Sequence, residues 1–432
     1  MKDTSRPKSI SFAKRALWFL LTAALLFGLL LCSTLVPGDA IRPQVLRSAD
    51  YLCEKEYLFD ALLPGVDSSR QDLYADSILL GIAWQYDSAD PVRSTLVSAY
   101  YSDPHQGENR NLRDAVTRDL PANQQYLRYW HGSAGILRLL LSVLSLRQVY
   151  FFHGIVLAVL AASLLLRLLR KRMFVAAVGI AVGLVGINCW FIPISLEFTW
   201  VFLILLVQLH IVLSKSFPRD PGRRAVFFLV SGMVTNFLDF LTCESLTLLM
   251  PLLMLMLLDR DDARPRMARK DLLCIAMDWA VGYGGMYLLK WGLAGIVMGE
   301  NPLPYITSHI GERMVGSVEG YSFFEILIMS LRRNVTALFP AGYDVPGMLA
   351  GIALLVAAGY IGYVHHRDGF DKGWIGTCAL FGAVPFLRYV TLVNHSYLHG
   401  FFTHRALMIT LFALVLILAE LTGWGQKKHG QT

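Results

Sequence analysis

Long, almost wholly apolar runs recur along this chain, and they limit its fold more than any other feature. Residues 16–37 form the first run, and 149–167 and 405–421 are typical of the later ones. About twenty helical residues cross the hydrocarbon core of a bilayer, whereas the strands of a β-barrel would give short alternating segments. Only 16% of the 432 residues are charged, against roughly a quarter in soluble domains. The sequence therefore predicts an all-α, polytopic bundle of transmembrane helices.

Basic residues cluster in alternate loops between the apolar runs, and this pattern predicts the topology. Cytoplasmic loops of membrane proteins carry an excess of Lys and Arg, so we place all the basic clusters in the cytoplasm. These clusters lie at the N-terminus, at 167–172, 215–224, 260–270 and 367–372, and at Lys427-Lys428. Both termini are then cytoplasmic, and about ten spans, with a range of about 8–12, fit the alternation. The expected spans are 16–37, 149–167, 174–191, 198–214, 225–241, 246–258, 272–298, 348–364, 374–391 and 405–421.

The longest polar stretch of the chain follows the first span directly. We therefore expect three regions: 1–37, the cytoplasmic N-terminus and first transmembrane helix; 38–133, an extracytoplasmic helical loop or cap; and 134–432, the multi-span transmembrane domain. Within the cap, residues 72–80 and 91–101 have the apolar spacing of helices. The first run is longer than the apolar core of a signal peptide and lacks a good cleavage site, so we expect it to be retained.

Arginines interrupt two further apolar stretches, 134–148 and 322–345. Arg138 and Arg147 lie in the first, and Arg332 and Arg333 lie in the second. This pattern predicts amphipathic helices at the membrane interface, or re-entrant segments, rather than spans.

The expected outward loops contain almost all of the unusual polar clusters, beginning with Asp39 and Arg42 at the end of the first span. A carboxylate one turn beyond a transmembrane helix can be partly desolvated, which raises its pKa toward the range of a general base. Asp39 is therefore the catalytic candidate, and Arg42 could hold a phosphate through two hydrogen bonds. The alternative is that Asp39 caps the next helix or marks the membrane interface.

Asp72 and Asp76 are spaced i and i+4, so they share one face of a helix. Such a pair could bind a divalent cation or hydrogen-bond sugar hydroxyls, and Asp72 is a candidate substrate ligand. No third ligand can be identified, so no metal residue is assigned. The alternative is that both acids favour the start of a helix, beside Arg70.

Aromatic and basic residues are concentrated at 126–132, in the sequence Tyr-Leu-Arg-Tyr-Trp-His-Gly. An aromatic face could stack on a sugar ring, with Tyr129 as the candidate, while Arg128 and His131 contact a phosphate or a hydroxyl. The alternative is a belt of aromatic residues at the membrane interface.

Single charges also lie at or within the later spans. Asp239 and Glu244 lie at the outer end of 225–241, and Glu197 and Lys290 stand in apolar sequence. Ionisable residues at membrane depth are costly and tend to be functional, so Asp239, Glu244 and Lys290 are candidate substrate ligands. The alternatives are an interfacial acid pair and, for Lys290, a side chain that snorkels to the interface.

The last expected outer loop contains His395 and His399, whose i, i+4 spacing can bind zinc on a helix. No HExxH glutamate accompanies them, which argues against a metalloprotease. Arg405 opens the last span, where it could hold a lipid-linked phosphate at the headgroup level. All three are candidate substrate ligands, with interfacial anchoring as the alternative.

Several functional classes lack their sequence signatures here. No P-loop, GxGxxG, GxSxG or nucleic-acid-binding motif is present, and no CxxC or Cys/His spacing indicates zinc. The net charge of +7 is explained by the basic loops, so we predict no nucleic-acid partner. No cofactor is assigned, although a divalent cation is left open.

The organisation of the chain resembles the GT-C class of integral membrane glycosyltransferases, which have a large first outer loop and an aspartate soon after the first helix. The resemblance implies a polyprenyl- or dolichyl-phosphate sugar as the donor. It places the catalytic acid on Asp39, and it places contacts to the lipid phosphate on Arg128, Lys290 or Arg405.

The chain also resembles a group of uncharacterised multi-pass membrane proteins of Gram-positive bacteria, at 128–132, 239–242, 282–291 and 394–405. It departs from many GT-C enzymes after Asp39, because no second acid follows directly. A second acid would have to come from farther along the chain, from Asp50 or Asp72.

The sequence therefore predicts a membrane glycosyltransferase at the extracytoplasmic face of the cytoplasmic membrane. Its partners would be a polyprenyl-phosphate-linked sugar, the lipid bilayer and a cell-envelope glycan or lipid acceptor. Two alternatives stay open: a transporter or flippase of envelope lipids or glycans, and a non-enzymatic envelope-assembly membrane protein.

Overall fold

A computed structural model describes residues 11–214, 217, 220–261, 269–315 and 320–425. The structure is 75% helix, and its described residues form no strand. The prediction of an all-α protein is therefore confirmed. The basic N-terminus, most of the basic loop at 260–270, and Lys427-Lys428 lie outside the described residues.

Six helices among the described residues are long and apolar enough to cross a membrane. They are α1 (Phe12–Ser33), α7 (Leu146–Arg170), α12 (Arg269–Met298), α15 (Asp344–Val364), α16 (Lys372–Thr391) and the stretch Gly400–Thr422, which ends in α19 (Met408–Thr422). The other four expected spans coincide with helices that are shorter or less apolar: α8 (Phe174–Gly186), α9 (Leu196–Val212), α10 (Pro221–Leu238) and α11 (Leu246–Asp261). Length and composition alone thus identify six of the ten expected spans.

The chain divides into two compact units, each built from separate stretches of sequence. Unit 1 comprises Met1–Asp60, Gln71–Val156 and Pro193–Ser308. Unit 2 comprises Ala61–Arg70, Leu157–Ile192 and His309–Thr432.

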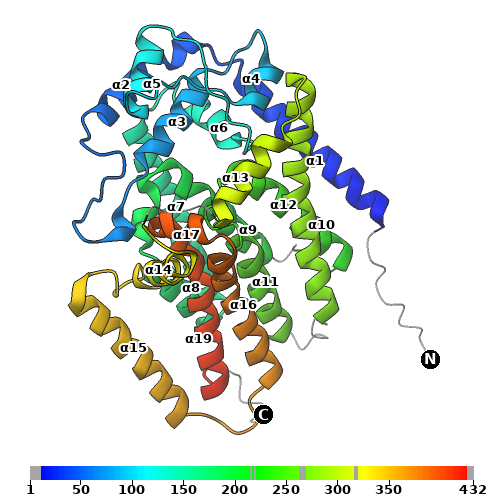
Figure 1. The fold of residues 1–432 in the computed structure, drawn as a ribbon. Helices are drawn as coiled ribbons and strands as arrows, with labels where there is room; N and C mark the ends of the chain where they lie inside the picture. The colour runs from blue at the N-terminus through cyan, green and yellow to red at the C-terminus, as the bar shows by residue number, and fades with distance from the viewer. Residues whose placement is uncertain (1–10, 215–216, 218–219, 262–268, 316–319, 426–432) are drawn as a thin grey trace. The chain divides into compact units, whose positions relative to one another are not determined.

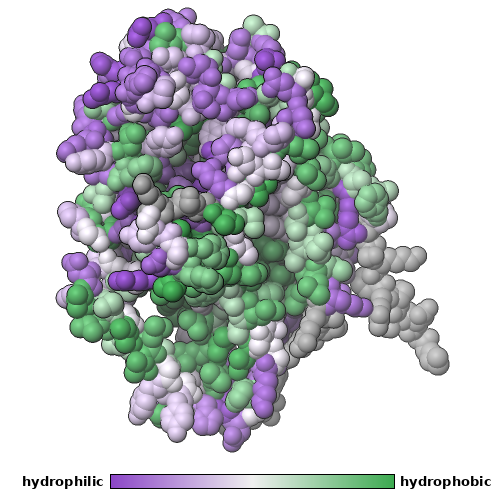
Figure 2. All heavy atoms as spheres, in the orientation of Figure 1, coloured by the Kyte–Doolittle hydropathy of each residue, from purple (hydrophilic) through white to green (hydrophobic). Residues whose placement is uncertain are grey.

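In unit 1, the polar stretch after α1 folds into short helices, as the sequence predicts. These are α2 (Gly38–Cys53), α3 (Leu73–Trp84), α4 (Pro91–Val97) and α5 (Glu108–Thr117). Asp72 and Asp90 cap α3 and α4, because their side chains accept hydrogen bonds from the backbone N–H groups of Ala75 and Arg93. Both α2 and α3 pack against α5 (Figure 1), and hydrophilic side chains gather over these helices (Figure 2).

The segment 134–148 has one buried and one exposed arginine. It contains most of α6 (Gly132–Leu140), in which Arg138 is buried. Arg138 Nη2 donates to the carbonyl of Val36 at 2.7 Å, and Nη1 donates to the carbonyl of Ala83. Arg138 therefore binds carbonyl groups of two other segments inside the protein, whereas Arg147 is exposed. The location of this segment at the membrane interface stays a prediction.

Helices α10 and α12 run side by side in unit 1 (Figure 1) and approach each other closely. A Cβ atom on Gly232 would lie 2.1 Å from the carbonyl oxygen of Trp279. A Cβ atom on Gly282 would lie 2.1 Å from the carbonyl oxygen of Leu229. The two backbones can therefore touch only because both positions lack a side chain.

In unit 2, α8 and α16 pack against α19, and α14 (Phe323–Thr336) packs against α17 (Val393–Leu398). Helix α14 begins with a capping box in which Ser322 and Glu325 each bind the other's backbone N–H. Its buried residues, Ile326, Ser330 and Asn334, share one face. A helix with one buried face is therefore present within 322–345, and its location at the membrane interface stays a prediction.

Candidate functional site

Two carboxyl groups of unit 1 share a hydrogen bond. Asp72 directly precedes α3, and Glu197 lies in the first turn of α9. The side chain of Glu197 hydrogen-bonds that of Asp72, and these residues are only 7% and 3% exposed. Two carboxyl groups buried side by side repel each other when both are ionised. Asp72 and Glu197 therefore form a buried carboxyl pair.

Backbone contacts hold this carboxyl pair in place. The backbone N–H of Asp72 donates to Ser195 Oγ at 2.8 Å, and Asp72 Oδ1 accepts from the N–H of Ala75 at 2.8 Å. Asp76 Oδ1 accepts from the N–H of Leu196 at 2.9 Å. The start of α3 is thus fastened to the start of α9 through groups that a helix N-terminus leaves unpaired.

Asp76 lies one turn after Asp72 and is fully buried. The hydroxyl of Tyr150 donates to its second carboxyl oxygen. Burial raises the pKa of Asp76 well above its ordinary value, and the nearby charge of Asp72 raises it further. Asp76 fastens α3 to α7 as well as to α9, so its role is to position Asp72.

Asp239 and Glu244 follow α10 and join the same acidic cluster. Asp239 is buried and accepts hydrogen bonds from both the N–H, at 3.0 Å, and the hydroxyl of Thr242. Asp239 lies close enough to Glu197 for the two carboxyl groups to interact electrostatically. Asp239 and Glu244 both interact in the same way with the hydroxyl of Tyr283 on α12. Asp239 therefore lies near Glu197 of the carboxyl pair, and Glu244 lies with Asp239 near Tyr283.

The segment 126–132 packs inside unit 1. The ring of His131 lies 4.8 Å from that of Tyr126 and 5.5 Å from that of Phe240, between centroids. Burial lowers the pKa of His131 well below its ordinary value, and the charges of Lys290 and Arg128 lower it further, so the imidazole is neutral. Tyr129 is buried too, which contradicts the alternative of a lipid-facing aromatic belt.

An exposed aromatic surface adjoins the carboxyl pair. The rings of Phe59 and Tyr74 stack at 6.0 Å, and these residues are 43% and 40% exposed. Burial raises the pKa of the Tyr74 hydroxyl; the nearby charge of Asp72 raises it too, and that of Arg128 lowers it. The guanidinium of Arg128 lies 4.8 Å from the Tyr126 ring centroid, within cation–π distance. Aromatic faces, a cation and paired carboxyls are thus combined at one place.

Sequence reasoning identified part of this site. Six of its candidates meet in unit 1: Asp72, Arg128, Tyr129, His131, Asp239 and Glu244. It missed Phe59 and Tyr74, and it noted Glu197 only as a single charge in apolar sequence without assigning it to the site. Tyr74 could have been found, because it lies two residues after Asp72 at the start of a helix, whereas nothing around Phe59 in the sequence indicates a site.

Lys290 of α12 is fully buried and bound to helix-end carbonyls. Its Nζ donates to the carbonyl oxygen of Leu96 at 2.6 Å and to that of Thr95 at 3.3 Å. It also lies 5.6 Å from the Trp130 ring centroid. The alternative in which Lys290 snorkels to the interface does not fit its burial, and the observed contacts give it a structural role at the end of α4 rather than that of a substrate ligand.

Replacing Lys290 by methionine should lower the melting temperature, because two carbonyl oxygens lose their donor in a site closed to water. We expect the free energy of unfolding to fall by about 2 kcal/mol. The melting temperature of the full chain in detergent measures this. Lys171→Met changes an exposed lysine in the same way and should have no effect. Equal melting of Lys290→Met and the wild type would contradict the structural role.

Asp39 and Arg42 lie on the first turns of α2. The side chain of Asp39 is 96% exposed, so the partial burial on which the general-base hypothesis depended is absent. Arg42 Nη1 donates to the carbonyl of Val116 at 2.6 Å, and Nη2 contacts Asp119. Arg42 therefore fastens α2 to the end of α5.

His395, His399 and Arg405 belong to unit 2. The two imidazole centroids lie 4.8 Å apart, and Arg313 Nη1 lies 3.1 Å from His399 Nε2. Arg405 is buried and donates from Nη2 to the carbonyl of Phe191 at 3.0 Å. The side chain of Arg405 is therefore enclosed within unit 2, and its contact with a lipid-linked phosphate stays a prediction.

Among the described residues, no group of three or more His, Cys, Asp or Glu side chains is placed to hold a metal ion. No protein-family model matches the chain, and no curated protein and no solved structure matches it.

Proposed function

We propose that the chain is a membrane glycosyltransferase, which transfers a sugar from a polyprenyl-phosphate donor to a cell-envelope acceptor. The observation that carries this proposal is the Asp72–Glu197 carboxyl pair beside the exposed Phe59–Tyr74 stack and Arg128. Paired carboxyls supply acid–base groups, aromatic faces stack on sugar rings, and a guanidinium pairs with phosphate. The resemblance to the GT-C class supports the same function.

In the proposed reaction, Asp72 accepts the proton of the acceptor hydroxyl. The hydroxyl oxygen attacks the anomeric carbon of the donor, and the bond from that carbon to the phosphate oxygen breaks. The electron pair leaves with the polyprenyl phosphate, whose charge Arg128 stabilises. Glu197 holds Asp72 in position. Asp72 replaces Asp39 as the proposed base, because Asp39 is exposed and lacks a carboxyl partner within this group.

The proposal includes a topology of ten spans with the helical cap outside the cell. The six long apolar helices support it, together with α8, α9, α10 and α11 as shorter spans. The alternation of basic loops supports cytoplasmic termini and a cap at the extracytoplasmic face. Cysteine substitutions at exposed cap and loop positions, labelled with a membrane-impermeant reagent in intact cells, test this topology.

Sugar transfer can be tested directly with the full chain in proteoliposomes. A panel of labelled polyprenyl-phosphate sugars is supplied with an envelope lipid and glycan extract as acceptor. We expect time-dependent labelling of the acceptor and equal release of polyprenyl phosphate. No labelled product from any donor would contradict the proposal.

A transporter or flippase is the second candidate, and one observation favours it. Asp76, Glu197 and Asp239 are buried acids near one another, and such acids often form proton relays in transporters. The same proteoliposomes distinguish the two functions. Movement of labelled lipid between leaflets that depends on a pH gradient, without sugar transfer, would support the transporter.

A further inference from the structure

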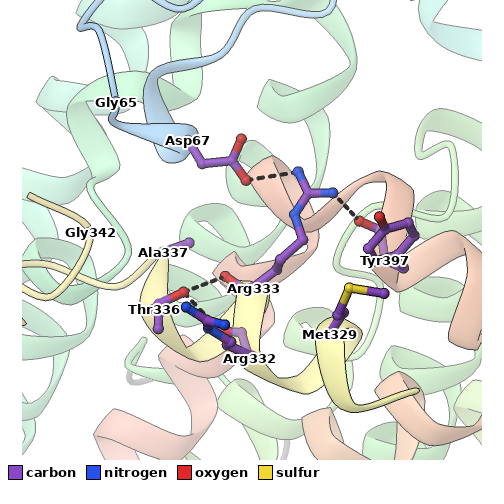
Figure 3. Close-up of a pocket in the computed structure, with 9 residues that line it drawn as sticks. All are labelled: Gly65, Asp67, Met329, Arg332, Arg333, Thr336, Ala337, Gly342 and Tyr397. Atoms are coloured by element: carbon purple, nitrogen blue, oxygen red, sulfur yellow. Dashed lines mark hydrogen bonds and ion pairs between the residues drawn. The ribbon is translucent and has the colours of Figure 1, made fainter. Parts of the chain in front are cut away.

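Unit 2 contains a groove that includes none of the residues of the carboxyl pair. Figure 3 shows this groove, a cavity of about 430 Å³ between α14, the loop before η1 (Asp67–Ser69), the turn after α14 and α17. Its lining residues are Gly65, Asp67, Met329, Arg332, Arg333, Thr336, Ala337, Gly342 and Tyr397.

Arg333 is held rigidly at the back of the groove. Its Nη2 pairs with Asp67 Oδ2 at 3.1 Å, and its Nη1 donates to the carbonyl of Tyr397 at 2.8 Å (Figure 3). The other oxygen of Asp67 pairs with Arg70 at 3.1 Å.

Among the lining residues Arg333 and Asp67 balance each other, and Arg332 adds a positive charge to the groove. Asp344 lies near its edge, because its Oδ1 is 3.6 Å from the position of a Cβ atom on Gly65. Arg332, unlike Arg333, is not held by other side chains of the groove. Its side chain is exposed, and among the described residues its guanidinium makes no hydrogen bond or ion pair. A guanidinium at the rim of the groove, with its donors unused, fits an anion with two oxygens on one atom.

The exposed side of α14 that bears Arg332 also carries Glu325, which binds the backbone N–H of Ser322 in the capping box, and two large apolar side chains. Phe324 and Ile328 precede Arg332 at i and i+4, and these two residues are 72% and 65% exposed. An exposed apolar stripe that ends in an arginine is the pattern of a helix lying in the membrane interface. Arginine in hydrocarbon is costly, so the stripe places Arg332 at the headgroup level, where lipid phosphate is the available anion.

We propose that this groove binds the phosphodiester headgroup of an anionic membrane lipid. Arg332 is the phosphate ligand, Arg333 lies behind it, and Phe324 and Ile328 lie against the acyl chains. Charge and shape both favour a phospholipid over a soluble anion, because a free phosphate gains nothing from the apolar stripe. The proposal does not depend on glycosyl transfer.

The test measures lipid binding to the purified full chain by native mass spectrometry in detergent. Phosphatidylglycerol, phosphatidylcholine, polyprenyl phosphate and inorganic phosphate are titrated separately. We expect phosphatidylglycerol to bind more tightly than phosphatidylcholine, and Arg332→Gln to weaken phosphatidylglycerol binding about fivefold. Arg332→Lys, which keeps the charge, should lose less affinity. Arg118→Gln, at an arginine that is 65% exposed in the cap, is the matched control and should bind as the wild type does.

Several results would overturn the proposal. They are unchanged phosphatidylglycerol affinity in Arg332→Gln, equal binding of the two phospholipids, or full displacement of phosphatidylglycerol by inorganic phosphate. Tighter binding of polyprenyl phosphate than of phosphatidylglycerol, with the same dependence on Arg332, would assign the groove to a donor lipid instead. Because Arg332 is exposed, its variants should melt as the wild type does. An independent variant, Ile328→Asn, should weaken binding of long-chain but not short-chain phosphatidylglycerol, and equal loss for both would contradict the acyl contact.

Discussion

Replacing Asp72 by asparagine should lower the rate of sugar transfer about a thousandfold while leaving the fold intact. Asparagine keeps the oxygen that accepts from the N–H of Ala75 at 2.8 Å in the wild type, and it caps helices as well as aspartate does. It cannot accept the acceptor's proton, and it removes one carboxyl group from the pair with Glu197. Catalysis is therefore lost without loss of the N-cap of α3.

The measurement is the initial rate of transfer in proteoliposomes, together with the melting temperature of each variant. Asp39→Asn makes the same chemical change at a carboxylate that is 96% exposed, so it decides between the two bases that sequence and structure favour. We expect it to retain most of the activity. Loss of activity in Asp39→Asn and normal activity in Asp72→Asn would reverse the assignment. Asp87→Asn, at another exposed acid, controls for the change of charge on the cap.

The fold class and the cap helices could be predicted because local patterns determine them. Apolar runs of about twenty residues are sufficient for membrane helices, and the helix at 72–80 was predicted from its apolar spacing. Span number was less predictable. Helix α8 ends at Gly186, before the end of the run 174–191 that predicts it, and α11 continues to Asp261, past the end of its run 246–258. Tertiary packing sets where each helix ends.

The roles of single charges could not be predicted, because they depend on distant backbone. Lys290, Arg138 and Arg405 all stand in apolar sequence, and each binds carbonyl oxygens of another segment. No local pattern tells a lysine that reaches a lipid phosphate from one that reaches the end of a helix. The pairing of Asp72 with Glu197 was invisible for the same reason, since it follows from the packing of α3 on α9.

Replacing Gly282 by alanine should destabilise unit 1 by about 3 kcal/mol, at the upper end of the usual cost of overpacking. The added methyl group would lie 2.1 Å from the carbonyl oxygen of Leu229, which is backbone and cannot turn away as a side chain could. Helices α10 and α12 would have to separate. The melting temperature of the purified chain measures the loss, and Gly232→Ala should act similarly from the other helix.

Gly284→Ala is the control that isolates packing from helix propensity. It lies on the same helix two residues later, and a Cβ atom there would meet nothing within 4 Å. Alanine favours a helix over glycine by about 1 kcal/mol, so this variant should melt at the wild-type temperature or above it.

Separation of α10 from α12 should also impair the candidate site, because Asp239 ends α10 and the Trp130 indole donates to the carbonyl of Met286 on α12 at 2.8 Å. Gly282→Ala should therefore lose transfer activity as well as stability, and equal melting of Gly282→Ala and Gly284→Ala would contradict the close contact between these helices.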